Sequence, residues 1–513
     1  MPSSGLTFGR DRVCGDCRRG LGVTGHLLVL TAAAAAAAWA GAAAAQSPTP
    51  AGQGGHRPPA VGRPGAQAAS TGLGSERALL ERATRSRVLG NGLTVVTMAN
   101  HGVPLATIEV DVRNGSFTQT PEYAGLAHMY EHMFFQANEA YPEPEAFINR
   151  TAELGAIFNG RTEEESVSYY LTLPSDSLEG GLRFMAAALR APLFLPQELA
   201  REKEVVIGEY DRQEANPFFG LTQTMTQKLF PGNFSRKNVI GDRSVVEHVT
   251  PEQMREIQHR YYVPNNSALI VTGDVDTARV FSLADRIFGD WPRQPDPFVA
   301  YPIPPIQPLT TNDAVIAEGP VSAVTVLIQW QGPSVGADPG ATYAADVFSD
   351  ALNMPGSAFQ QHLVDSGLWQ SVGVNYYTLN HTGPISISGQ TTPDKLRPAL
   401  AALDREIARF DSIGYVTPEA LVETKAQRAV NSAFGRERAS GYAHTIGFWW
   451  SVANLEYYFG YVDNMAARTP ADLAAYARRY IVGKPRITGV LISPSDRAAI
   501  GLTETELTGA AAQ

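Results

Sequence analysis

Two histidines and a glutamate at helical spacing stand in the segment AHMYEHMFF, residues 127–135. His128, Glu131 and His132 follow the order H-x-x-E-H, the inverted form of a zinc-binding helix motif. Because residues four apart lie on one face of an α-helix, the two imidazoles can bind one metal ion with Glu131 beside it. A carboxylate in that place can take a proton from water. The pattern indicates metal-assisted hydrolysis, although two histidines four apart also occur on helices that bind no metal.

A catalytic zinc site needs a third protein ligand, and a charged segment further along the chain could supply it. Residues 196–214 predict a helix, since proline stands in the first turn and acidic residues follow early. In this segment Glu209 follows His132 by 77 positions, and Glu202 lies two helical turns before Glu209 on the same face. A solvated charged helix without ligands has the same composition, so the residues alone leave the third ligand open.

The pattern resembles the pitrilysin and mitochondrial-processing-peptidase-like family of inverted zincins, in its short two-domain bacterial form. In that family H-x-x-E-H is followed by a ligand glutamate, with a second glutamate seven positions before it. The resemblance extends over about residues 86–500, and the further fragments that agree in order are Gly92-Leu93-Thr94, Gly125-Leu126-Ala127 and Tyr261-Tyr262 before Pro264-Asn265-Asn266.

The resemblance implies one Zn²⁺ per chain, with His128, His132 and Glu209 as its ligands. It further implies Glu131 as the general base and Glu202 as an acid that supports a ligand. The activity implied is that of a zinc-dependent metalloendopeptidase that hydrolyses peptides or small unfolded polypeptides.

The same resemblance implies where a peptide substrate binds. Asn159 and Gly160 correspond to the start of an edge strand, along which substrate pairs main chain to main chain as an added strand. A simple helix-to-strand turn explains these two residues equally well. Phe135 corresponds to an aromatic residue that lines the substrate pocket, and an ordinary core phenylalanine is the alternative.

Strand-like and helix-like segments alternate around these residues, which predicts an α+β fold. Strands at 93–98 and 106–113 precede the H-x-x-E-H helix, which Thr120 and Pro121 are expected to open as N-cap and first residue. The sequence further predicts helices near 145–154 and 177–189 and a strand at 165–173, which together with the elements above would form one layer of strands and one of helices.

The second half of the chain appears as a repeat of the first without its metal residues. The run 323–330 has the pattern of the second strand of the first half, and Phe348 and Leu352 take the places of His128 and His132. Together with the resemblance, this predicts two similar sheet-plus-helices domains in tandem, half of a clamshell. The first domain carries zinc and the second is inactive.

Composition defines the remaining segments. Arginines precede an apolar, alanine-rich run at the start of the chain, as in a cleaved export signal, so the protein is expected to be periplasmic or secreted, and membrane-anchored only if the run is retained. Cys14 and Cys17 would leave with the signal.

A net charge of −10 without a basic stripe argues against nucleic acid as a partner. We expect an export signal at 1–45, a flexible Pro/Gly/Ala-rich linker at 46–85, a zinc-binding catalytic domain at 86–300, an interdomain linker at 301–309, an inactive peptidase-like domain at 310–500 and a tail at 501–513.

One departure from the family bears on the partner. The family's second domain usually carries an arginine and a tyrosine, four and eleven residues after a phenylalanine, and both help to hold substrate. After Phe359 these positions are Leu363 and Gln370, and neither can do so. We therefore expect the zinc subunit of a heterodimer whose homologous partner supplies the Arg/Tyr pair, with a homodimer as the other arrangement. The alternatives are a non-catalytic assembly subunit and a protein that binds peptides without cutting them.

Overall fold

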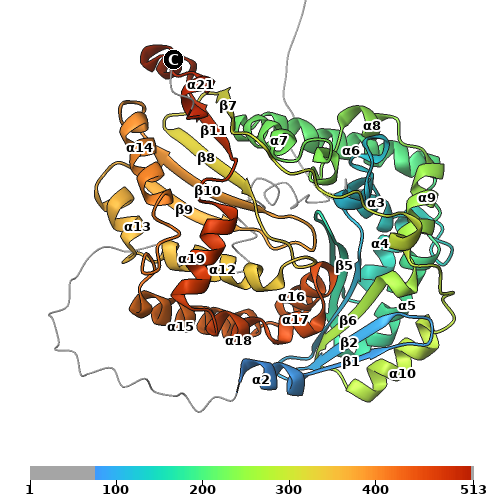
Figure 1. Ribbon diagram of the computed structural model, residues 1–513. Coiled ribbons are helices and arrows are strands. Elements are labelled where there is room, and N and C mark those ends of the chain that lie inside the picture. Colours follow the sequence, from blue (N-terminus) through green and yellow to red (C-terminus); the bar gives the residue numbers. More distant parts are fainter. Residues whose placement is uncertain (1–74, 510–513) are drawn as a thin grey trace, which may run out of the picture.

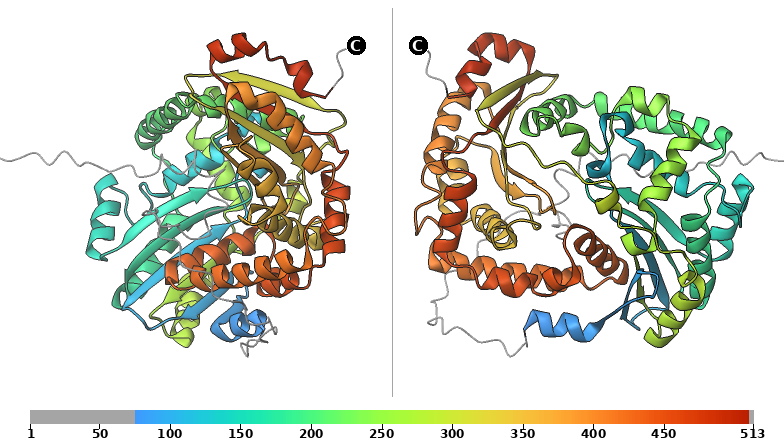
Figure 2. Two further views of the ribbon diagram at one scale, coloured as in Figure 1. Left: turned by 90° about the vertical axis from the view of Figure 1, so that its left-hand side faces the viewer. Right: turned by 45° about the vertical axis from the view of Figure 1, so that its right-hand side comes forward.

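The computed structural model of the chain describes residues 75–509 (Figure 1). The predicted export signal and its two cysteines lie outside the described residues. Two mixed sheets follow one another along the chain, each with helices packed against it, which is the two-domain α+β fold that the sequence predicted. In Figure 2 the two halves, blue to green and yellow to red, lie side by side.

The first domain contains a six-stranded sheet in the order β1-β2-β6-β3-β5-β4. Its strands are β1 (Thr84–Val88), β2 (Thr94–Ala99), β3 (Leu105–Val112), β4 (Ile157–Thr162), β5 (Val167–Pro174) and β6 (Ser267–Gly273). Its main helices are α3 (Leu126–Phe134), α4 (Pro144–Glu153), α5 (Leu178–Arg190), α6 (Pro196–Glu214), α8 (Arg243–Glu247), α9 (Pro251–Tyr261) and α10 (Thr277–Phe288). Every residue of β6 is buried, as expected for an interior strand rich in valine, isoleucine and leucine.

The second domain contains a five-stranded sheet in the order β7-β11-β8-β10-β9. Its strands are β7 (Asp313–Glu318), β8 (Val324–Gln331), β9 (Ser371–Tyr376), β10 (Pro384–Thr391) and β11 (Ile487–Ile492). Its main helices are α12 (Pro339–Asn353), α14 (Leu396–Ile407), α15 (Pro418–Gly435), α18 (Tyr461–Ala466) and α19 (Pro470–Tyr480).

Apart from β1, the two sheets have the same topology. β2 lies parallel to β6 and β7 lies parallel to β11, whereas the other neighbouring strands pair antiparallel in both sheets. The strand order also corresponds one to one. The repeat predicted from the sequence is therefore confirmed at the level of the fold.

Each half of the chain also contributes one helix to the sheet of the other half. Helix α7 (Pro217–Leu229) packs on β7 and β11, and α16 (Ala439–Val452) packs on β3 and β6. Leu221 and Met225 of α7 join Leu491 of the second sheet in one apolar cluster, and Ile446 of α16 joins Ile270 of the first sheet in another. This exchange joins the two domains through buried apolar surface.

The expected linker at 46–85 is wrong for its last residues. Residues 76–83 form helix α2 (Glu76–Ala83), which Ser75 caps and in which Leu80 is buried in the core of the second half. The sequence ERALLERA consists of good helix formers around an apolar pair, a pattern that the neighbouring Pro/Gly-rich composition concealed.

The expected tail at 501–513 is likewise wrong in part, because α21 (Glu504–Leu507) packs on β7 and buries Leu507. Between Ala300 and Asp313 the chain forms no helix or strand, as expected of a connection between domains. Within residues 75–509, no helix is long and apolar enough to cross a membrane.

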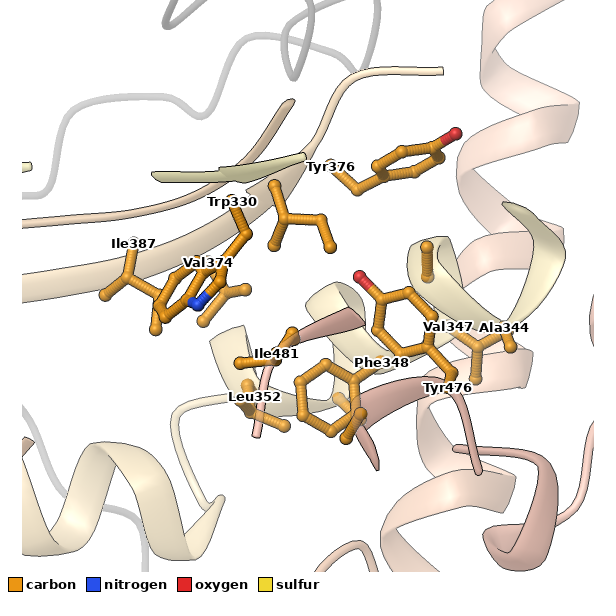
Figure 3. Packing of buried hydrophobic residues seen from close by; sticks show 14 of the residues in the cluster. Trp330, Ala344, Val347, Phe348, Leu352, Val374, Tyr376, Ile387, Tyr476 and Ile481 are labelled. Carbon is orange, nitrogen blue, oxygen red and sulfur yellow. The ribbon is translucent and has the colours of Figure 1, made fainter. Parts of the chain in front are cut away.

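Helix α12 occupies in the second domain the place that α3 has in the first. Phe348 and Leu352, at the positions of the two motif histidines, are buried in the core of the second domain. Figure 3 shows them packed with Trp330, Ala344, Val347, Val374, Tyr376, Ile387, Tyr476 and Ile481.

Candidate metal centre

Helix α3 begins later than its sequence signals predicted. Residues 121–123 form a separate 3₁₀ turn, and α3 starts at Leu126 after Gly125, which has the left-handed φ of 97°. Gly125 lies directly against Gly241, where an added Cβ would stand 2.1 Å from Gly125 Cα. Only glycine permits this backbone contact, so the contact, and not Thr120 with Pro121, sets the start of the helix.

One face of α3 is buried and the other carries the motif. Met129, Tyr130 and Met133 are fully buried in the core of the first domain, which leaves His128 and His132 on the side that faces α6. Helix α6 spans the residues that the sequence predicted for it, and it packs beside α3.

Three side-chain atoms from these two helices converge. Nε2 of His128 lies 3.5 Å from Oε2 of Glu209, and Nε2 of His132 lies 3.7 Å from the same oxygen. The two rings stand 4.9 Å apart and nearly perpendicular, at 85°. Ligand atoms at about 2.0–2.1 Å from a tetrahedral metal are about 3.3 Å apart, so this set fits a zinc ion after a small contraction. Within residues 75–509 these three residues are the one group of His, Cys, Asp and Glu that could hold a metal ion.

Glu202 supports one of the two rings. Its Oε2 lies 3.1 Å from Nδ1 of His132, which must donate because a carboxylate only accepts. Its other oxygen accepts a hydrogen bond from Gln136 Nε2 at 3.1 Å. Nδ1 of His128 is buried and finds no hydrogen-bond partner among the described residues, so the support is one-sided.

The two rings differ in charge. Burial and the neighbouring charge of His132 lower the pKa of His128 to about 4. Burial also opposes a charge on His132, but the carboxylates of Glu202, Glu209 and Glu131 outweigh it and raise the pKa of His132 to about 10. Burial opposes the charge of Glu209 as well, yet the histidines hold the pKa of Glu209 below its usual range. Without a metal, the centre holds its proton on His132.

Glu131 lies beside this centre, against strand β4. The hydroxyl of Thr162 donates to Glu131 Oε2 at 2.6 Å. Burial raises the pKa of Glu131 above its usual range, while the charge of His132 and this hydrogen bond oppose the rise. Gly160 provides the space, since a Cβ there would stand 2.8 Å from Glu131 Cγ.

The sequence reasoning did not identify Thr162. The spacing could have indicated it. Gly160 was already a candidate, and Thr162 stands two residues further along the same strand, so it lies on the same face.

The predicted substrate-contact residues lie in and beside the edge strand. Asn159 and Gly160 lie within β4, the outermost strand of the first sheet, so the alternative of a simple turn is wrong. Phe135 follows α3 directly and is partly buried against Phe158, at 5.0 Å between ring centroids. It thus belongs to a cluster of aromatic rings at this edge, formed with Phe147, Phe158 and Tyr169.

The two positions of the missing Arg/Tyr pair have different surroundings. Leu363 is fully buried in the core of the second domain, and Gln370 is exposed just before β9. Neither side chain is a substitute for an arginine or a tyrosine that reaches a substrate.

Comparisons with known proteins identify relatives of both halves of this chain. The profile of the insulinase family, peptidase family M16, matches residues 94–239, and that of the peptidase M16 inactive domain matches residues 248–428. An uncharacterized zinc protease of Rickettsia felis is 23% identical over 364 residues, which cover 70% of this chain and 85% of that protein.

Two crystal structures show the same fold. A protease from Helicobacter pylori superposes with a TM-score of 0.71 at 20% identity, over 80% of this chain and 99% of that one. The periplasmic protease PqqL from Escherichia coli superposes with a TM-score of 0.68 at 16% identity, over 84% of this chain but only 50% of PqqL.

Proposed function

Since this chain belongs to peptidase family M16, the insulinase family, we propose that it is a zinc-dependent metalloendopeptidase that cleaves peptides or small unfolded polypeptides. The observation that carries the proposal is the convergence of His128 Nε2, His132 Nε2 and Glu209 Oε2, with the glutamate oxygen 3.5 and 3.7 Å from the two nitrogens and all three atoms within 4.8 Å of one another. These three residues would hold the ion. When bound, zinc would supply a Lewis acid that polarises a peptide carbonyl and acidifies water.

Glu131 is the proton carrier of this proposal. Its carboxylate takes a proton from the attacking water and later gives it to the leaving amine. Burial, which raises the pKa of Glu131, favours the step in which the carboxyl group holds that proton. Glu202 keeps the proton of His132 on Nδ1, so that Nε2 faces the metal.

Strand β4 is the proposed substrate-binding element. As the last strand of the sheet it has one unpaired edge, and an extended peptide can add to it main chain to main chain. Asn159 and Gly160 would lie along the bound peptide, and Phe135 would line the pocket for one of its side chains.

A homologous partner subunit completes the proposal. Buried Leu363 and exposed Gln370 replace the arginine and tyrosine expected to hold substrate. A second subunit of the same fold would supply the other half of the clamshell and the Arg/Tyr pair. Export to the periplasm fits the apolar segment near the start of the chain.

The test is the purified mature protein with Zn²⁺ and a mixed peptide pool, with and without a candidate partner subunit. Glu131→Gln should bind zinc with unchanged stoichiometry and lose cleavage by about 100- to 10,000-fold, the usual contribution of general acid–base catalysis. Cleavage by Glu131→Gln at the rate of the wild-type protein would assign the proton transfer to another group.

A further inference from the structure

The turn between β4 and β5, residues 163–166, is held from both domains. On the side of the first domain, the backbone N–H groups of Ser116 and Phe117 donate to the carbonyl oxygens of Glu163 and Glu164, at 3.3 and 2.8 Å. Backbone hydrogen bonds of this kind fix the path of a turn.

The loop between β9 and β10 holds the other side of this turn. The carboxylate of Glu165 accepts the backbone N–H of Asn380 at 2.6 Å, the backbone N–H of His381 at 2.9 Å and the ring Nδ1 of His381 at 3.0 Å. The Glu165 side chain is 1% exposed. The hydroxyl of Tyr377 donates to the neighbouring Glu164 at 2.9 Å. Since a buried donor without an acceptor is costly, these contacts hold the turn firmly against the second domain.

The two contacting loops are equivalent in the two domains. The β9–β10 connection in the second sheet corresponds to the β4–β5 connection in the first, because the sheets share their strand order and directions. The second domain has Phe348 and Leu352 at the positions of the two motif histidines, and its β9–β10 hairpin contacts the β4–β5 hairpin of the first domain.

The same turn leads directly to the proposed base. Thr162 is the last residue of β4 and donates to Glu131 at 2.6 Å. Gly160, on the same face of β4, lets Glu131 lie close against the strand, since a Cβ there would stand 2.8 Å from Glu131 Cγ. A shift of β4 must therefore shift the carboxylate of Glu131 or break its hydrogen bond.

We propose that the second domain positions Glu131: its β9–β10 loop holds Glu165, the turn holds β4, and Thr162 holds the carboxylate. Thr162 and Glu165 are positioning residues, since neither needs to touch the substrate through its side chain. The inference rests on the proposed function, to which it adds a role for the domain without metal residues.

The first test uses Thr162 in the zinc-loaded protein. Thr162→Val should lower kcat about 10- to 100-fold, as expected for the loss of a hydrogen bond to a charged group, with KM within about twofold. The substitution should leave both the backbone of β4 and the zinc content unchanged. Thr162→Ser restores the hydroxyl and should return kcat to within about threefold of the wild-type value. Equal losses in the valine and serine variants would contradict the role of the hydroxyl.

The second test combines Thr162→Val with Glu165→Ala. Because Glu165 acts through Thr162, the double variant should lose less than the product of the two single losses. Glu76→Gln is the control, since Glu76 of α2 is a half-buried carboxylate that pairs with Arg436 of the second domain. Helix α2 contacts β1, which lies at the opposite edge of the first sheet from β4. The effect of Glu76→Gln should multiply with that of Thr162→Val. Multiplicative effects of Glu165→Ala and Thr162→Val would overturn the proposal.

Amide hydrogen exchange gives a readout that does not depend on activity. In Glu165→Ala, exchange should accelerate at least about tenfold in residues 157–166, and in Glu76→Gln it should not. If Glu165→Ala does not fold, His381→Ala is the substitute, because it removes the ring donor, one of three hydrogen-bond donors to Glu165. It should accelerate exchange in the same residues, but by a smaller factor. If either variant folds and its exchange rates in residues 157–166 are unchanged, the proposal that the second domain fixes β4 is refuted. A wild-type protein that binds zinc and cleaves nothing, both with and without the partner subunit, refutes the proposed function instead, and the exchange result still stands.

Discussion

Metal binding to this centre should expel one proton, and that proton should come from His132. Its pKa is raised to about 10, whereas the pKa of His128 is lowered to about 4. Between pH 5 and pH 9 the metal-free centre therefore carries about one proton, which a metal ligand must lose. Two ordinary imidazoles with a pKa near 6.5 would together carry only about 0.2 protons at pH 7.5. The apparent zinc affinity should accordingly rise about tenfold, or 1.4 kcal/mol, for each pH unit over this range.

Glu202→Gln is the perturbation that isolates the ring. The amide keeps the shape of the side chain but removes the negative charge that lies 3.1 Å from His132 Nδ1. The pKa of His132 should fall, so at pH 9 the variant should release clearly less than the one proton that the wild-type protein releases. Glu198→Gln is the matched control, because Glu198 lies one turn earlier in α6 and accepts the backbone N–H of Ala137 instead of a histidine.

The assay is isothermal titration of the metal-free proteins with Zn²⁺ in buffers of different ionisation enthalpy, which counts the protons released. Any proton lost by bound water is common to all three proteins, so the difference between them reports on the ring. Identical counts in the Glu202→Gln variant and the wild-type protein at pH 9 would refute the role of Glu202. A Glu198→Gln variant that matches Glu202→Gln would refute it as well.

Two further predictions concern the second domain. Burial raises the pKa of Asp346 to about 7, so the stability that this group contributes is complete below about pH 4 and is lost as pH rises through about 7. Asp346→Asn should therefore gain up to about 4 kcal/mol of unfolding free energy relative to the wild-type protein between pH 4 and pH 8, measured by urea denaturation, and a constant difference would contradict this. Leu363→Arg, which restores the family's arginine, should cost about 3–5 kcal/mol because it buries an unpaired charge, whereas Gln370→Tyr at its exposed position should stay within about 0.5 kcal/mol. A stable Leu363→Arg protein with increased single-chain activity would show that the side chain reaches the substrate and not the core.

The elements that could be predicted from the sequence are those with local signals. Helix α6 has the predicted bounds, because proline at its start and its charged pattern are properties of the segment itself. The shared face of His128 and His132 follows from their spacing alone. The third ligand is different: Glu209 lies on another helix, and a separation along the chain says nothing about a distance in space. For this residue only the resemblance to a known family pointed to the site.

The errors come from contacts between distant segments. Thr120 and Pro121 are sound N-terminal signals, but the contact of Gly125 with Gly241 overrides them. The exchange of α7 and α16 between the two sheets was not predicted either, since an apolar helix face does not reveal which sheet will cover it.

The comparison of α3 with α12 explains why only one of two equivalent domains can hold a metal. Helix α3 buries one face and presents the other, with its histidines, toward α6 at the rim of the sheet. Helix α12 is buried almost all round, from Thr342 to Leu352, by the sheet and by α15, α18 and α19. A ligand pair at the positions of Phe348 and Leu352 would point into closed apolar packing, with no room for water or a peptide. In the second domain these positions stabilise the core, and its contribution to the reaction passes through the loop that holds β4.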